Sequence, residues 1–286
     1  MPFKAFDTLV FAGGGNRCFW QAGLVTYLRE QGHVLPANLI GTSAGAAVAA
    51  SCLTIGPQAA LNQCKHLFAD NHRLFYWRDL GRLKLHFAHQ ETYPAWIGAF
   101  LNADTFPLLK QSAQKLQVVV THPAKRLGKG GSVAAGTLAY LVDKKWTRDI
   151  HPRLSRFLGL RQAFYDLQAC STLEAAQRLL YASAAAPPFM NSVMLDGQWA
   201  FDGGYIDNAP VPTQTPEARA RTLVLLTRHY PNRPEYFQHN GRTYWQASQK
   251  IPVTTWDCTA NANVMGAFEL GYTDARRHVQ RAAGSA

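Results

Sequence analysis

The sequence predicts an α/β fold in which helices flank a mainly parallel central sheet. Two short apolar runs, residues 8–12 and 39–42, are each followed by a glycine-containing turn and then by a helical pattern. Strands and helices that alternate over so few residues are typical of parallel strands joined by right-handed crossovers. A chain of 286 residues can form one such domain with an insertion. We expect a single domain over residues 1–286, with a helical cap inserted at about 72–170.

Composition restricts the class of protein and the class of partner. Hydrophobic residues make up 47% of the chain and charged residues 16%, which excludes an intrinsically disordered protein. The formal net charge of +11 favours anionic partners, namely phospholipid head groups, nucleic acid or acidic proteins. Charge alone does not choose among these three.

The cysteines and the N-terminus indicate a compartment. The five cysteines are scattered and form no C-x-x-C pair, which favours a reducing compartment and indicates neither a disulfide framework nor a zinc site. They are Cys18, Cys52, Cys64, Cys170 and Cys258. Residues 1–7 lack the apolar core of a signal peptide, and no stretch approaches the roughly 18 apolar residues of a membrane span. We therefore expect a cytoplasmic protein.

A serine lies between two glycines where the second apolar run ends. Residues 41–45, with Gly41, Ser43 and Gly45, have the G-x-S-x-G pattern of a nucleophile elbow. In such an elbow a sharp turn between strand and helix exposes the serine hydroxyl, and small residues let the strand and helix approach closely. The alternative is that Ser43 only caps the helix that follows.

A glycine loop follows the first apolar run. It consists of Gly13, Gly14, Gly15, Asn16 and Arg17. A dinucleotide fingerprint would need glycine where the chain has cysteine after Arg17, and no Walker G-K-[ST] follows. What remains is a set of backbone amides that can bind a small negative charge. Since both glycine turns end parallel strands, we expect this loop to face the elbow serine.

An aspartate follows a predicted β-hairpin over residues 194–201. Asp202 precedes Gly203 and Gly204, so its carboxylate is presented where backbones can come close. The alternative is a simple Asp-Gly turn. A buried strand is predicted at residues 222–227, and His229 lies just beyond it.

The remaining pattern predicts further elements. We expect helical structure over residues 57–116, a strand at 117–121, a flexible loop at 128–131, a helix from 172 to about 184 and a surface helix at 262–281. Two basic and aromatic segments, 72–90 and 144–161, are assigned to the cap over the site, where they could meet a charged interface. Ordinary solvated helices, and for the first segment a nucleic-acid surface, are the alternatives.

Three segments in order resemble the patatin family of lipid acyl hydrolases. They are residues 13–17, residues 41–45, and residues 202–204 with Asn208 and Pro210 downstream; residues 182–189 resemble the family's approach to its catalytic aspartate. The resemblance spans roughly residues 8–212. The chain departs from the family at Ala12, where an acidic residue is common, and at Cys18, where glycine is common.

The resemblance implies a three-layer α/β/α fold and a Ser43–Asp202 dyad. Ser43 would attack an ester carbonyl, Asp202 would accept its proton, and amides of the loop from Gly13 to Arg17 would hold the oxyanion, with Arg17 adding positive field. A free aspartate has a pKa of about 4, so burial should raise the pKa of Asp202 if it is the base.

Three readings of function follow. The preferred one is a phospholipid or lysophospholipid acyl hydrolase that acts at an anionic membrane surface, with no cofactor, metal or nucleic acid. The second is an α/β-hydrolase with a Ser43–Asp202–His229 triad, because the chain order of these residues fits. The third is a catalytically silent module that binds lipid or nucleic acid.

Overall fold

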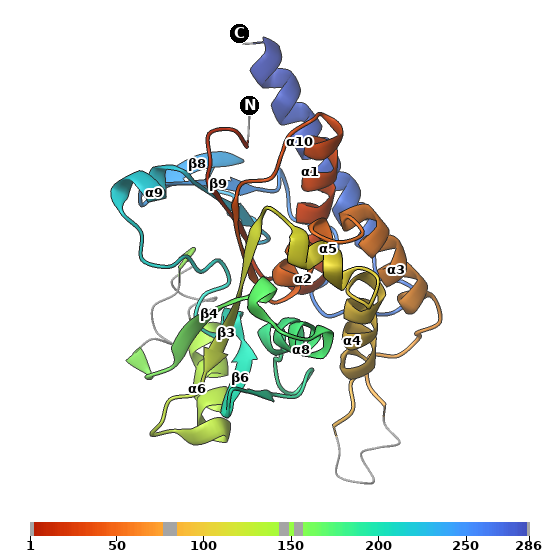
Figure 1. The fold of residues 1–286 in the computed structure, drawn as a ribbon, viewed down its shortest axis with the longest axis vertical. Coiled ribbons are helices and arrows are strands. Elements are labelled where there is room, and N and C mark those ends of the chain that lie inside the picture. The colour runs from red at the N-terminus through yellow and green to blue at the C-terminus, as the bar shows by residue number, and fades with distance from the viewer. Residues whose placement is uncertain (1–2, 77–84, 143–148, 152–156, 285–286) are drawn as a thin grey trace.

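A computed structural model describes residues 3–76, 85–142, 149–151 and 157–284 (Figure 1). Within these residues nine strands form one sheet in the order β5-β6-β3-β2-β1-β7-β9-β8, with β4 also paired to β3. The strands are β1 Thr8–Phe11, β2 Asn38–Thr42, β3 Lys115–His122, β4 Arg161–Asp166, β5 Val193–Leu195, β6 Gln198–Asp202, β7 Thr222–Leu226, β8 Tyr236–His239 and β9 Arg242–Gln246.

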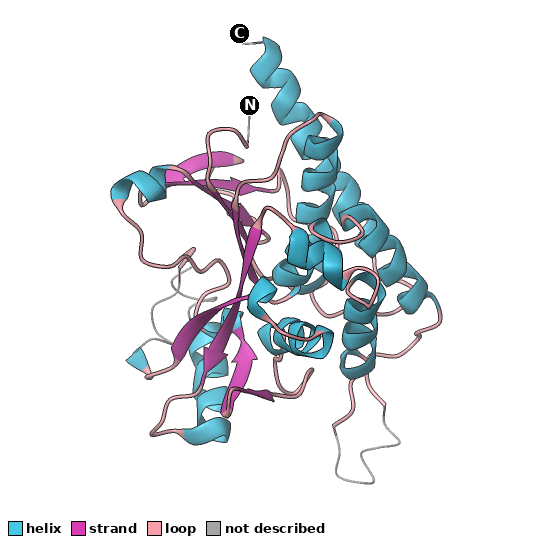
Figure 2. Cartoon of the chain, viewed as in Figure 1, coloured by secondary structure: helices cyan, strands magenta, loops and turns pink. Residues whose placement is uncertain are grey.

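The centre of the sheet is parallel and its margins are antiparallel. Strands β3, β2, β1, β7 and β9 run parallel to one another, as the sequence predicts. The hairpin strands β5 and β6, with β4, pair antiparallel beside β3, and β8 pairs antiparallel with β9. The sheet is therefore mixed but mostly parallel, and helices flank it (Figure 2).

Alternating side chains of the central strands enter two separate cores, since successive residues of a strand point to opposite faces. Leu9 and Phe11 of β1 pack into the larger core and Val10 into the smaller one. Most helices cover the larger core: α1 Phe19–Glu30, α2 Ala44–Cys52, α3 Pro57–Ala69, α4 His89–Phe100, α5 Phe106–Gln111, α8 Leu173–Ser183 and α10 Val264–Gly284. Loop residues such as Ile150 and Ala209 cover the smaller core.

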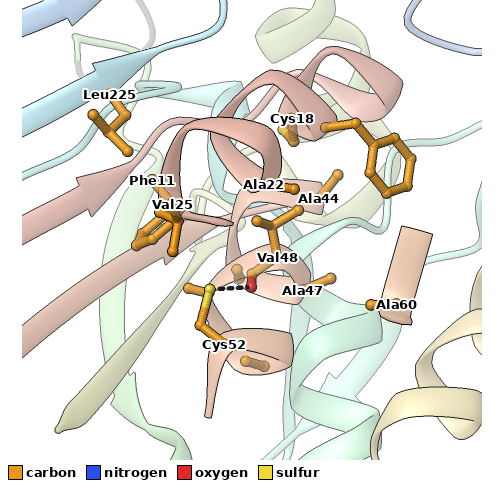
Figure 3. Packing of buried hydrophobic residues seen from close by; sticks show 14 of the residues in the cluster. Phe11, Cys18, Ala22, Val25, Ala44, Ala47, Val48, Cys52, Ala60 and Leu225 are labelled. Atoms are coloured by element: carbon orange, nitrogen blue, oxygen red, sulfur yellow. Dashed lines mark hydrogen bonds between the residues drawn. The ribbon is translucent and has the colours of Figure 1, made fainter. Parts of the chain in front are cut away.

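Helix α2 is buried along its whole length. Its nine residues are small or β-branched, so the helix can lie directly on the sheet between α1 and α3. Figure 3 shows Ala44, Ala47 and Val48 packed among neighbouring helices and strands, with the Cys52 thiol bonded to the Val48 carbonyl. Burial of this kind fixes the N-terminal end of α2, and with it Ser43.

Several predictions of local structure are corrected. Residues 128–131, predicted as a flexible loop, begin helix α6 Gly128–Val142. By contrast, the surface helix predicted at 262–281 is present as α10, and its inner side, with Phe268 and Ala275, is buried against α1. The hairpin of β8 and β9 was not among the predicted elements.

The predicted cap is only partly described. Residues 72–170 contain α4 and α5, but also β3, which lies in the middle of the sheet, and β4. A cap with those bounds would therefore include a core strand. Of the two basic segments assigned to the cap, residues 77–84, 143–148 and 152–156 lie outside the described part of the chain.

Candidate active site

Strand register brings Ser43 and Asp202 to one level of the sheet. Ser43 follows the last residue of β2, and Asp202 is the last residue of β6. Strand β3 lies between them, where Val119 pairs with Thr42 of β2 and Val120 pairs with Asp202. Two side chains 159 positions apart in the sequence thus meet where β2 and β6 end, on either side of β3.

The elbow at Ser43 has the strained backbone that its pattern predicts. Ser43 has φ 56° and ψ −135°, a conformation that L-residues rarely adopt. The flanking glycines permit the turn: a Cβ on Gly41 would lie 2.4 Å from the Cα of Ala46, and one on Gly45 would lie 2.5 Å from the Ala12 carbonyl oxygen. Close backbone contact holds the serine in this position.

The Ser43 hydroxyl donates a hydrogen bond to the Asp202 carboxylate, with 2.7 Å between Oγ and Oδ2. The other carboxylate oxygen accepts the Gly204 amide at 2.7 Å, at the start of the turn η5 Gly203–Tyr205. Both Ser43 and Asp202 are buried. Burial raises the pKa of Asp202 to about 6, against the lowering effect of these two hydrogen bonds. The carboxyl is thereby a better base than a free aspartate.

A second serine, which the sequence did not indicate, fixes the backbone of the elbow. The Ser43 amide donates to Ser183 Oγ at 2.8 Å, and Ser183 Oγ donates to the Val119 carbonyl at 2.6 Å. Ser183 is fully buried at the C-terminal end of α8. The amide of Ser43 is therefore engaged and is not available to an oxyanion. Ser183 lies in the segment 182–189 that resembles the family, but no local pattern indicates its contact with the elbow.

The glycine loop is tethered at two of its predicted residues. The Gly13 amide donates to the Asn208 carbonyl at 2.7 Å. Asn16 donates its amide to the Thr255 carbonyl at 3.2 Å and its side chain to the carbonyl of Thr254. Both residues are buried and serve to anchor the loop.

Gly14 and Gly15 hold the free donors of the loop. In the part of the chain that the structure describes, neither amide has a hydrogen-bond acceptor. Both residues are partly exposed and line the same cavity as Ser43 and Asp202. Arg17 Nε donates to the Gly14 carbonyl at 3.3 Å, which steadies the peptide. The five predicted loop residues are thus brought to the serine, with different local roles.

The two departures from the family pattern are accommodated in the core. Cys18 is buried and its thiol contacts the Ala12 carbonyl oxygen at 3.4 Å. Burial raises the pKa of this thiol well above its usual range, so Cys18 is neutral. The loop retains its free amides with these two residues in place.

His229 does not contact the Ser43–Asp202 pair. Its Nδ1 lies 2.9 Å from the Ala247 carbonyl oxygen, and the Ser43 hydroxyl is bonded directly to the carboxylate. The geometry of a triad, in which an imidazole stands between hydroxyl and carboxylate, is absent from these three residues.

Two cavities meet at Ser43. The narrower has a volume of about 40 Å³ and lies between α2, α3 and α4, with walls that include Val48, Phe68 and Trp96. Its titratable side chains are neutral: burial lowers the pKa of His89 to about 4 and raises that of Tyr93 well above its usual range. The Tyr93 hydroxyl is buried and has no partner among the described residues.

The wider cavity, of about 360 Å³, opens on the other side of the serine. Asp202, Arg17 and Asn208 supply its polar walls, and Phe189 with Trp256 its aromatic wall, where the two rings stack 4.7 Å apart. Ser43, Gly15 and Trp256 line both cavities. A molecule that lies across Ser43 can therefore occupy an apolar and a polar space at once.

Fold and site define the class: α/β proteins in which a serine and a glycine loop follow two parallel strands and meet an aspartate from an adjacent antiparallel strand. The chain belongs to the patatin-like phospholipase family, whose model matches residues 9–213. Membership supports a lipid acyl hydrolase as the general class of activity.

Two other comparisons are narrower. The chain is similar to VipD from Legionella pneumophila, of known crystal structure, with 13% sequence identity and a TM-score of 0.47. That match covers 96% of this chain and 66% of the VipD chain. No curated protein sequence matches the chain. Among the described helices none is both long enough and apolar enough to cross a bilayer.

Proposed function

We propose that the protein is a serine acyl hydrolase that cleaves fatty acyl esters of phospholipids or lysophospholipids through a Ser43–Asp202 dyad. The observation that carries this proposal is the 2.7 Å hydrogen bond from the Ser43 hydroxyl to a buried carboxylate, beside the unpaired amides of Gly14 and Gly15. These are a nucleophile, its base and two oxyanion donors in one cavity.

The first half-reaction forms an acyl-enzyme. Ser43 Oγ attacks the ester carbonyl carbon while its proton moves to Asp202 Oδ2, and the carbonyl oxygen becomes an oxyanion between the Gly14 and Gly15 amides. Each good donor stabilises the transition state by about 3 kcal/mol. Asp202 then gives the proton to the departing alkoxide, and the C–O bond to the alcohol breaks.

Water completes the cycle. Asp202, again ionised, takes a proton from a water molecule that attacks the acyl-enzyme, and the same two amides hold the second oxyanion. When this intermediate collapses, Ser43 recovers its proton from Asp202 and the fatty acid leaves. With a pKa of about 6, the carboxyl is mostly ionised at neutral pH and still basic enough to accept these protons.

The two cavities suit the two halves of a lipid ester. The narrow cavity has apolar walls and neutral titratable groups, so it suits the acyl chain at its ester end. The wide cavity contains Arg17, which pairs with no carboxylate of the described residues and suits a phosphate. We assign the alcohol half of the substrate, with its head group, to this wide cavity.

The proposed function also includes a cellular location and a membrane on which the enzyme acts. Its five cysteines are free thiols, as in a reducing compartment, and its net charge is +11. We therefore propose a cytoplasmic enzyme that binds peripherally to anionic membranes. The mechanism uses no metal, cofactor or nucleic acid.

Labelling with a fluorophosphonate tests the dyad. The wild type should be labelled and Ser43→Ala should not, whereas His229→Ala should keep both labelling and turnover because its imidazole contacts neither reacting group. Mass spectrometry of mixed vesicles after incubation should show free fatty acid and the matching lysolipid or glycerophosphodiester. Loss of activity in His229→Ala with an intact fold would favour the triad, and absence of labelling in the wild type would favour a silent module.

A further inference from the structure

Helix α6 has an exposed apolar face, although its first residues, 128–131, were predicted to form a flexible loop. Four positions at helical spacing, Leu127, Gly131, Ala134 and Leu138, are exposed and form what we call the α6 face. Leu127 is 41% exposed and Leu138 is 64% exposed. A soluble helix normally presents polar or charged residues on its outer side, and this face has none.

The opposite side of α6 is already occupied by the protein. Ser132 and Ala139 are buried, and the absence of a side chain at Gly136 lets Tyr205 of η5 approach, because a Cβ there would lie 2.7 Å from the ring. From position 130 to 142 the sequence contains no charged residue. After Lys129 the outer side of the helix is therefore uncharged, as expected of a helix with a second apolar partner on that side.

Cations surround the N-terminal end of the face. Lys125, Arg126 and Lys129 are exposed, and none pairs with a carboxylate among the described residues. Lys129 Nζ lies 3.8 Å from the centre of the Trp199 ring, an arrangement of cation and aromatic that is frequent at membrane interfaces. An apolar face with adjacent unpaired cations matches the acyl and phosphate layers of an anionic bilayer.

The face adjoins the rim of the wide cavity. Thr137 lines that cavity, and it lies on the same side of the helix as Ala134 of the face, three positions earlier. Phe157 is 84% exposed. It lies near the N-terminal end of α6, because Gly159 and Leu160 pack against Ala124, which shortly precedes that helix. A bilayer seated on the α6 face would therefore lie beside the opening that leads to Ser43.

We propose that the α6 face is the surface by which this protein docks on anionic phospholipid bilayers. The proposal rests on the proposed function, because a hydrolase of phospholipids has to reach substrate held in a membrane. Docking through this face would place the wide cavity at the lipid surface and deliver the ester to Ser43 without extracting the whole lipid into water.

Vesicle flotation with matched variants tests the proposal. Leu138→Asp puts a charge on the face, whereas Leu108→Asp puts the same charge at a leucine of α5 that is 50% exposed. On vesicles of equimolar phosphatidylglycerol and phosphatidylcholine, Leu138→Asp should bind at least tenfold more weakly than the wild type, and Leu108→Asp within about twofold. Ala134→Glu should repeat the effect of Leu138→Asp. Replacing Lys125 and Arg126 by Gln should weaken binding about fivefold for each cation removed.

A water-soluble short-chain ester separates docking from chemistry. Leu138→Asp should hydrolyse this monomeric substrate at the wild-type rate and lose activity only on vesicles. Failure of the wild type on the soluble ester would overturn the proposed function without touching the docking result. Equal vesicle binding by Leu138→Asp and Leu108→Asp, or no binding by the wild type, overturns the docking proposal; a change of oligomeric state confined to Leu138→Asp would instead assign the face to a protein partner.

Discussion

Helices α2 and α6 both follow parallel strands and both begin in glycine-containing segments, yet α2 is buried on all sides and α6 on one side only. All nine residues of α2 are buried. The Ala12 carbonyl oxygen lies so close to Gly45 that a Cβ on this residue would be only 2.5 Å from it. In α6 the corresponding early glycine, Gly130, has no atom within 4 Å of the position of a Cβ. Packing requires glycine at Gly45 of α2 and places no constraint on Gly130 of α6.

In the proposed mechanism, this difference separates the part of the molecule that holds the reacting atoms from the part that binds the membrane. Around α2, backbone contacts fix Ser43 to the precision that catalysis needs. Around α6, the outer residues are exposed to solvent, and no packing within the protein restricts which side chains they carry. Substitutions in the first region should therefore change stability and turnover together, and those in the second should change binding to a surface.

Gly45→Ala should have the largest effect. The added Cβ would overlap the carbonyl oxygens of Phe11 and Ala12, so strand and helix would have to separate. We expect a loss of about 3 kcal/mol in the free energy of unfolding, and turnover should fall because Ser43 moves with the helix. Urea unfolding and hydrolysis of a soluble ester measure the two. A Gly45→Ala protein of wild-type stability would show that the close approach is not required.

Ser183→Ala should come second. It removes the acceptor of the Ser43 amide and the donor to the Val119 carbonyl, both of which are buried. An unsatisfied buried group costs about 1–3 kcal/mol, and kcat should fall because the elbow backbone loses its tether. Ser132→Ala in α6 is the matched control, since it deletes a buried hydroxyl that accepts the Ala124 amide. It should lose stability but keep kcat; equal kcat for the two variants contradicts the tethering role.

The next largest effect should be on pH dependence: hydrolysis, which uses Asp202, should depend on pH, and vesicle binding through α6 should not. Because Asp202 has to be ionised to accept the serine proton, kcat/KM should fall below pH 6 and be about tenfold lower at pH 5 than at its plateau. Vesicle binding through the α6 face does not involve Asp202 and should hold over this range. A flat profile of hydrolysis between pH 5 and 8 would exclude Asp202 as the base.

Over the same pH range, the contribution of Asp202 to the stability of the fold should change in the opposite direction to activity. A native-state pKa raised from 3.8 to about 6 means that folding favours the protonated carboxyl, so the contribution of Asp202 to stability is full below about pH 4 and is lost as pH rises through 6. The fall in activity at low pH therefore cannot be ascribed to loss of this group's contribution to folding, and circular dichroism across the titration checks that the fold persists.

Local patterns predicted the elements that carry the reacting groups. The G-x-S-x-G turn predicted the backbone at Ser43, and the Asp-Gly hairpin predicted the delivery of Asp202 at a strand end. The pairing of the two residues came from a family resemblance, because no local pattern tells which strand lies beside β3. The prediction that burial raises the pKa of Asp202 agrees with the structure.

Contacts between residues far apart in the sequence could not be predicted from local patterns. Ser183 binds the Ser43 amide across 140 positions, and neither the end of helix α8 nor the family-like segment 182–189 indicates that contact. Residues 128–131 contain three glycines, which favour a loop, but tertiary packing of Ser132 and Gly136 stabilises the helix. The hairpin of β8 and β9 did have a local signal in Asn240-Gly241, both with positive φ, which the sequence analysis did not use.

Gly130→Ala should have the smallest effect and the opposite sign. Nothing in the structure approaches the new Cβ, and alanine is favoured over glycine in a helix interior by about 0.5–1 kcal/mol, so the free energy of unfolding should rise by that amount. Hydrolysis of a soluble ester should be unchanged. Because the same substitution in α2 is expected to destabilise, the two variants measured together test whether glycine is held by packing at Gly45 and is free at Gly130. Destabilisation by Gly130→Ala would mean that residues 128–131 need the flexibility of a loop, as their composition first predicted, and that α6 begins later than the structure has it.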